Sequence, residues 1–192
     1  MKKWIFAIPL LIAMVIIFFI SGPSFTAISA AKSHSFLPKD AELVEQFDTG
    51  TSILFLFKSD GEKNYHTVLA ERSGVFYRSS SSTYFPYSTD KIQTVGGMSF
   101  TSENDEASLL SVISYDEEIA FIEAGAEDNI ERKEINKGER VTFLFPYSEQ
   151  LDFLYPRALN KEGEILYYYG YPKDTNVTYS GDLRWYKVDG QS

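Results

Sequence analysis

Cysteine is absent from this chain of 192 residues, and histidine occurs only at His34 and His66. Without cysteine there is no disulfide, no thiolate metal ligand and no acceptor for a lipoprotein's lipid. Zinc hydrolysis is excluded too, since there is no HExxH motif and only two imidazoles. A serine triad would depend on His66, and the chain has no GxSxG motif. We therefore predict no catalytic residue, no metal ligand and no cofactor.

Basic residues are in a minority. The chain has 18 lysines and arginines against 27 acidic residues, which gives a formal net charge of −9. A negative field of this kind repels phosphates, so we predict that the protein binds no nucleic acid. A simpler role for the acidic balance is to keep an exported domain soluble.

Charge is missing altogether from a long stretch near the N-terminus. After Lys2 and Lys3, residues 4–20 are uncharged and almost wholly apolar, and the next charge is Lys32. A helix of this length spans about 25 Å, and the uncharged residues that follow it complete the ~30 Å of a bilayer core. The two lysines place the N-terminus in the cytoplasm. We predict that residues 4–20 enter the membrane and that the remainder is extracytoplasmic.

Two interpretations of this segment remain open. In one, it is a retained signal-anchor of a single-pass protein of the cell membrane, with its C-terminal domain outside. In the other, it is a signal peptide cleaved near Ala31, after the small residues Ser29 and Ala30, and the domain is secreted. The apolar run is longer than the usual ~7–15 residues of a signal peptide, which favours the anchor.

In the rest of the chain, short runs typical of β-strands alternate with residues typical of turns. Residues 52–58 and 64–71 are separated by Asp60-Gly61, a dipeptide typical of hairpin turns. Strand-like runs then recur every ~8–12 residues between turns marked by glycine, which favours antiparallel sheets over βαβ units. We predict a mainly β fold, an antiparallel sandwich or two small packed β modules, preceded by one N-terminal transmembrane helix.

The expected division of the chain follows its composition. Asp40 is suited to cap a short helix whose apolar face is Leu43, Val44 and Phe47, and Gly96-Gly97 is expected to end a strand. The predicted units are an anchor or signal peptide at 1–31, a linker and short helix at 32–50, a β-meander module at 51–100, an acidic connector at 101–107 and a β-sandwich-like module at 108–192.

Aromatic residues give the strongest functional indication. Tyr84, Phe85 and Tyr87 follow a run of serines in residues 79–90, a stretch with the composition of a loop. Exposed aromatics anchor protein partners or stack on sugars. The alternative is that they fold back as a lid over the sheet. We predict these three as partner-binding residues, whereas the tyrosines of 167–171 are expected to pack within a sheet.

Carboxylates are numerous but lack a diagnostic arrangement. Asp116, Glu117 and Glu118 lie in a predicted turn, where solvated acids are expected, and residues 103–106 and 127–129 have oxygen ligands for Ca²⁺ without EF-hand spacing. A glycosidase needs two carboxylates across a cleft, and sequence does not give that distance.

The order of elements provides a resemblance. An apolar anchor, the Asp60-Gly61 hairpin and the strand-rich segments 109–123, 139–146 and 158–167 resemble small exported, β-rich proteins of Bacillus-type Gram-positive bacteria. The resemblance implies a location and a β fold, and it carries over no functional residue. We expect a non-catalytic cell-envelope protein that binds an envelope protein or a cell-wall polymer. The alternative is an envelope hydrolase that uses a carboxylate pair.

Overall fold

The computed structural model describes residues 9, 12, 24–126, 129–173 and 177–188. Its described part is built almost entirely from short strands. The elements are helix α2 (Ala27–Lys32), strands β1 (Glu42–Asp48), β2 (Ser52–Ser59), β3 (Asn64–Ser73), β4 (Phe76–Pro86), β5 (Ile92–Thr101), β6 (Glu106–Ser114), β7 (Phe121–Ala124), β8 (Glu131–Glu134), β9 (Arg140–Phe145), β10 (Arg157–Leu159), β11 (Ile165–Gly170) and β12 (Arg184–Lys187), and 3-10 turns η1 (Leu151–Leu154) and η2 (Ser180–Asp182).

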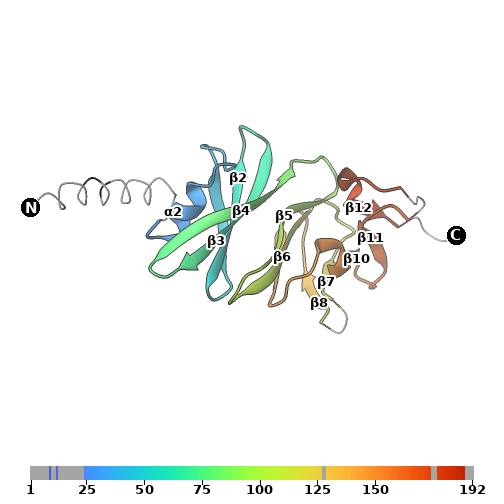
Figure 1. The fold of residues 1–192 in the computed structure, drawn as a ribbon. Helices are drawn as coiled ribbons and strands as arrows, with labels where there is room; N and C mark the ends of the chain where they lie inside the picture. Colours follow the sequence, from blue (N-terminus) through green and yellow to red (C-terminus); the bar gives the residue numbers. More distant parts are fainter. Residues whose placement is uncertain (1–8, 10–11, 13–23, 127–128, 174–176, 189–192) are drawn as a thin grey trace, which may run out of the picture.

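The strands form three antiparallel sheets. The first sheet has the order β1-β2-β3-β4, the middle sheet β5-β6-β9 and the last sheet β12-β11-β10-β7-β8. In Figure 1, α2, the first sheet, the middle sheet and the last sheet follow one another across the molecule. The predicted mainly β, antiparallel fold is confirmed, and the packed sheets are consistent with a β sandwich.

Two apolar layers cover the two faces of the first sheet. Side chains alternate along a strand, so Phe55 and Phe57 of β2 pack against α2, while Leu54 packs against Met98 and Leu109 of the middle sheet. Each of these five side chains is at least 95 % buried. Because both faces are covered, β2 has a nearly continuous apolar run rather than alternation.

A third apolar layer joins the middle sheet to the last one. Leu110 and Val112 of β6 pack with Phe143 of β9, Ile122 of β7 and Tyr167 of β11. Strand β6 is therefore buried on both faces and forms the centre of the molecule. Without disulfides, these three apolar layers hold the fold together.

The chain enters the fold earlier than expected. Ser24 forms a bridge with Tyr77 of β4, and α2 buries Ala27, Ala30 and Ala31 on the first sheet. We expected residues 24–31 to belong to the anchor or signal peptide, but they are part of the packed domain. Alanine suits this position because its small side chain lets a helix lie close to a sheet. Residues 4–20 fall outside the described residues, apart from residues 9 and 12. Within the described ranges, no helix has the length and apolar character needed to cross a bilayer.

The predicted short helix after Asp40 is wrong. Residues 42–48 form β1, which pairs antiparallel with β2 at the edge of the first sheet. Leu43 and Val44 are exposed there, and Phe47 alone of the three apolar residues packs into the core. A pattern of two helical turns is too short to be stable by itself, so pairing with a neighbouring strand prevails.

Two further local predictions are wrong for a related reason. Residues 79–86 form part of β4 rather than a loop, with Ser81 opposite Leu69 and Ser82 opposite Val68 in β3. Gly96 and Gly97 lie inside β5 beside a bulge, where a side chain would meet its neighbours, rather than at its end.

The acidic stretch 101–107, expected to connect two modules, spans the hairpin turn between β5 and β6. These strands pair with each other from Ile92 opposite Ser114 to Thr101 opposite Glu106. The middle sheet thus takes β5 from the segment 51–100 and β6 and β9 from the segment 108–192.

Candidate functional site, an aromatic groove

A groove lies where β4, β5 and β12 meet. Its volume is about 470 Å³. Its aromatic residues come from β4, β11 and β12, and its polar residues come from β5, from β12 and from the loop between β4 and β5. We call it the aromatic groove. The lining residues discussed below are Tyr84, Phe85, Gln93, Tyr169, Arg184 and Trp185.

The C-terminal side of the groove is fixed by strand pairing. Trp185 of β12 lies opposite Tyr169 of β11, with their ring centroids 5.5 Å apart. Trp185 Nε1 donates a hydrogen bond of 3.1 Å to Thr94 Oγ1, which ties the last sheet to β5. Burial holds the pKa of the Tyr169 phenol well above its usual value, so this ring is uncharged. This side is therefore a preformed apolar surface with few free polar atoms.

Polar groups border the aromatic surface. Gln93 Nε2 donates to the carbonyl oxygens of Ser88 and Asp90, which orders the loop between β4 and β5. The Arg184 guanidinium lies 5.0 Å from the centre of the Tyr186 ring. Aromatic surfaces bordered by a small number of orienting polar groups are typical of ligand sites.

The three sequence-predicted residues have different positions. Tyr84 borders the groove and is 66 % exposed, with its ring 6.3 Å from that of His66 on the outer face of the first sheet. Phe85 lines the groove and is half-buried against Gly97 of β5, where an added Cβ would meet its ring at 3.1 Å. The structure brings these two to one site, although only Tyr84 is freely exposed.

Tyr87 lies elsewhere. Its ring packs 4.9 Å from Tyr65, and its hydroxyl donates a 2.9 Å hydrogen bond to Asp60 in the β2–β3 turn. Burial and that hydrogen bond hold its pKa well above the usual value for tyrosine. Tyr87 is accordingly a support of the β2–β3 hairpin, outside the aromatic groove.

Sequence reasoning missed Tyr169 and Trp185 as groove residues. Tyr169 was expected to pack within a sheet, and it does so by pairing with Trp185 of β12, but both side chains also line the groove. They are separated from Phe85 by more than 80 residues of chain, so no local spacing connects them. The available signal was the tryptophan of the predicted last strand, since tryptophan is enriched at binding sites.

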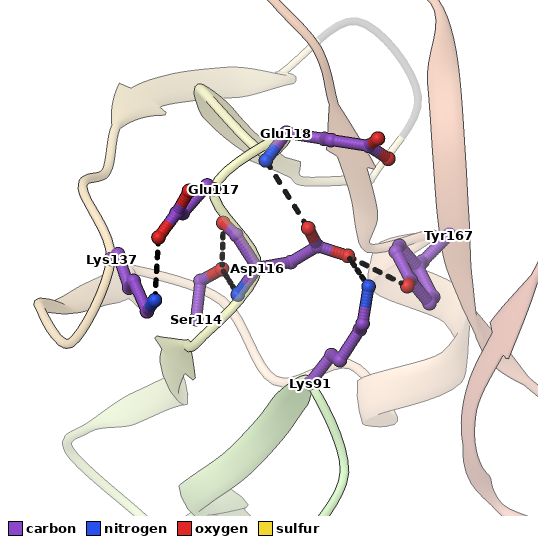
Figure 2. Close-up of polar contacts among 7 residues, drawn as sticks. All are labelled: Lys91, Ser114, Asp116, Glu117, Glu118, Lys137 and Tyr167. Atoms are coloured by element: carbon purple, nitrogen blue, oxygen red, sulfur yellow. Dashed lines mark hydrogen bonds and ion pairs between the residues drawn. The ribbon is translucent and has the colours of Figure 1, made fainter.

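The acidic turn after β6 contains a buried carboxylate, that of Asp116, which holds neighbouring segments together. Asp116 is only 5 % exposed, so the expectation that it is solvated is wrong. Figure 2 shows its carboxylate between three donors: Lys91 Nζ at 3.1 Å, Tyr167 Oη at 3.0 Å and the Glu118 backbone N–H at 3.2 Å. Burial raises the pKa of Asp116, but these three donors outweigh it, and the pKa lies below its usual value.

The acidic residues next to Asp116 and in the β5–β6 turn form ion pairs and hydrogen bonds within turns. Glu117 pairs with Lys137 at 2.6 Å, and both side chains are more than half exposed. A second cavity of about 760 Å³ is bordered by Asp48, Glu103, Asp105 and Glu106. Asp105 Oδ2 accepts hydrogen bonds from the turn between β1 and β2, the shortest being 2.6 Å from Thr49 Oγ1, so this carboxylate joins two turns.

No group of three or more acidic or histidine side chains is placed to hold a metal ion among the described residues. Residues 127–128 of the second acidic stretch lie outside them. His66 is buried on β3, and burial lowers its pKa, although Glu62 lies 4.0 Å from its Nε2. His66 therefore packs within the first sheet as a strand residue.

Comparison with protein-family models, with curated proteins and with solved structures gave no match.

Proposed function

We propose that this is a non-catalytic protein of the bacterial cell envelope, held by residues 4–20, whose extracytoplasmic domain binds an envelope protein or a cell-wall polymer in the aromatic groove. The observation that carries the proposal is the convergence of Phe85, Tyr169 and Trp185 on one cavity, with the exposed ring of Tyr84 at its border. Aromatic side chains supply large contact areas at low entropic cost and stack on sugar rings.

Retention of the N-terminal segment is supported by the packing of α2. Ala30 and Ala31, next to the candidate cleavage site, have no exposed surface. Cleavage after Ala31 would remove the helix that covers Phe55 and Phe57 of the first sheet. A cleaved chain would therefore expose a core layer, which favours a retained anchor over a secreted form.

Site-specific photo-crosslinking in intact cells tests the binding proposal. A photoreactive amino acid replaces Tyr84 in the full-length protein, and the matched control carries it at Tyr155, which is 55 % exposed and does not line the groove. We expect discrete adducts with a protein or with wall material at position 84 and none at 155. Equal labelling at both positions, or none at 84, would contradict the proposal.

A second measurement uses the sparse tryptophans of the chain. The chain has two tryptophans, Trp4 and Trp185, so a Trp4→Phe variant reports on the groove alone. Binding of soluble wall fragments should shift Trp185 emission, and Arg184→Ala should weaken that response about tenfold, as loss of one orienting contact does. If wall material is instead degraded, and Asp48→Asn abolishes the degradation, the hydrolase alternative holds.

A further inference from the structure

The end of the molecule formed by α2 has an apolar surface beside the point where the chain enters the domain. Phe25 is 70 % exposed just before α2, and Val75 is 72 % exposed in the β3–β4 turn. The Phe25 ring lies 5.1 Å from that of Phe76. We call these three residues the apolar tip. Phe76 is half-buried, so Phe25 and Val75 supply most of the exposed apolar surface. Exposing two large apolar side chains together to water is unfavourable, and such a patch is typical of a contact surface.

The apolar tip is fixed close to the apolar run of the N-terminus. The Ser24 N–H donates to the Tyr77 carbonyl at 2.9 Å, and the Tyr77 N–H donates back at 2.7 Å. Residues 21–23 alone separate this pair from Ile20, the last residue of the run. From Ile20 to Ser24 the chain can extend at most about 14 Å. The headgroup region outside the hydrocarbon core is itself roughly 5–7 Å deep, so Ser24 cannot lie far beyond it. An anchored chain therefore holds Phe25 at or near the membrane surface.

Charge at the apolar tip differs in sign from the protein as a whole. The Arg72 side chain donates a 3.2 Å hydrogen bond to the Gly74 carbonyl, so its positive charge lies in the same turn as Val75. The full chain has a net charge of −9. Apolar side chains combined with arginine are the composition of segments that lie in a bilayer interface and contact anionic headgroups.

We propose that the apolar tip inserts into the interface of the bilayer that holds residues 4–20 and thereby fixes the orientation of the domain. This inference rests on the proposed function, because it requires a retained anchor. The sheets then stack outward from the membrane in the order first, middle and last, since α2 lies at one end of the molecule (Figure 1). The domain is a rigid projection rather than a module on a flexible tether.

The chain has no cysteine, so one introduced cysteine is a unique attachment point for a probe. Val75→Cys and Phe25→Cys are each labelled with an environment-sensitive fluorophore in the full-length protein. The control is Ile130→Cys, which is 55 % exposed beside β8 of the last sheet. The proteins are placed in nanodiscs of phosphatidylglycerol and phosphatidylcholine, with and without nitroxide on the headgroups. We expect nitroxide to remove most of the fluorescence at positions 25 and 75 and to leave that at 130 unchanged.

The outcomes separate the inference from the anchor on which it rests. Protein that does not copurify with nanodiscs overturns both. Protein that copurifies but shows no quenching at either position 25 or 75, or equal quenching at 130, overturns the apolar tip while the anchor stands. Two labelled positions guard against local misfolding at one of them, and the melting midpoint of each labelled protein should match that of the unlabelled chain.

Discussion

Replacing Asp116 with alanine should destabilise the protein by about 2–4 kcal/mol. The buried hydroxyl of Tyr167 loses its acceptor, which costs roughly 1–3 kcal/mol, and the Glu118 N–H loses a bond of about 1 kcal/mol. Lys91 adds little, because its side chain is 63 % exposed and regains water when the carboxylate is removed. Asp116 connects Lys91, just before β5, and Tyr167 of β11 to the turn after β6. Its removal should therefore lower the free energy of global unfolding rather than that of one local segment.

Glu117→Ala is the matched control for this substitution. Glu117 is the next residue in the same turn and also has an ion pair, but the side chains of Glu117 and Lys137 are 76 % and 55 % exposed. Exposed pairs of this kind are worth about 0–1 kcal/mol. Urea unfolding at neutral pH, followed by circular dichroism, gives both free energies. If Asp116→Ala costs no more than Glu117→Ala, the structural role assigned to the buried carboxylate is refuted.

The pH dependence gives a second, independent readout of Asp116. Its folded pKa lies below the ordinary value of 3.8, so its contribution to stability is present above that value and is lost as the pH falls through the folded pKa. Asp116→Asn should therefore make the unfolding free energy fall less steeply below about pH 4 than it does in the parent protein. Equal slopes would mean that Asp116 is not held ionised by its three donors.

Three further predictions concern stability. Gly97→Ala should cost about 1–3 kcal/mol in urea unfolding, because its Cβ would clash with the Leu151 side chain and would also meet the Phe85 ring at 3.1 Å. A chain of residues 32–192 should melt well below one of 24–192, with a loss of roughly 3 kcal/mol or more, since it lacks three alanine methyl groups buried on the first sheet and uncovers the core beneath them. Tyr167, whose pKa burial and Asp116 raise to about 12, should contribute stability that is present below pH 10 and lost as the pH rises to 12, so Tyr167→Phe should flatten alkaline unfolding.

The fold class could be predicted because its signals are local. Period-two alternation and turns marked by Asp60-Gly61 are properties of short segments, and they persist whichever strands pair. The turn itself depends on more than this dipeptide, since Asp40 accepts hydrogen bonds from Ser59 and from the Gly61 N–H. Local composition thus located the hairpin, whereas its stabilising contact comes from a segment 19–21 residues earlier.

The two edge strands of the first sheet could not be predicted in the same way. In β1, Leu43, Val44 and Phe47 fit a helical face as well as a strand, and only pairing with β2 separates the two. In β4, serines occupy the positions opposite Val68 and Leu69. An edge strand has fewer neighbours to pack against, so its sequence is less constrained and resembles that of a loop.

The same pairing decides the roles of the aromatic residues. Once residues 76–86 are a strand, alternation places Tyr84 and Phe85 on opposite faces, one beside His66 and the other against Gly97. Tyr87 lies past the end of the strand, where its hydroxyl donates a hydrogen bond to Asp60 in the β2–β3 turn. Three residues that look equivalent in the sequence therefore become an exposed ring, a groove wall and a hairpin support. Which of them is free to bind depends on the register of β4 against β3, and that register depends on contacts far along the chain.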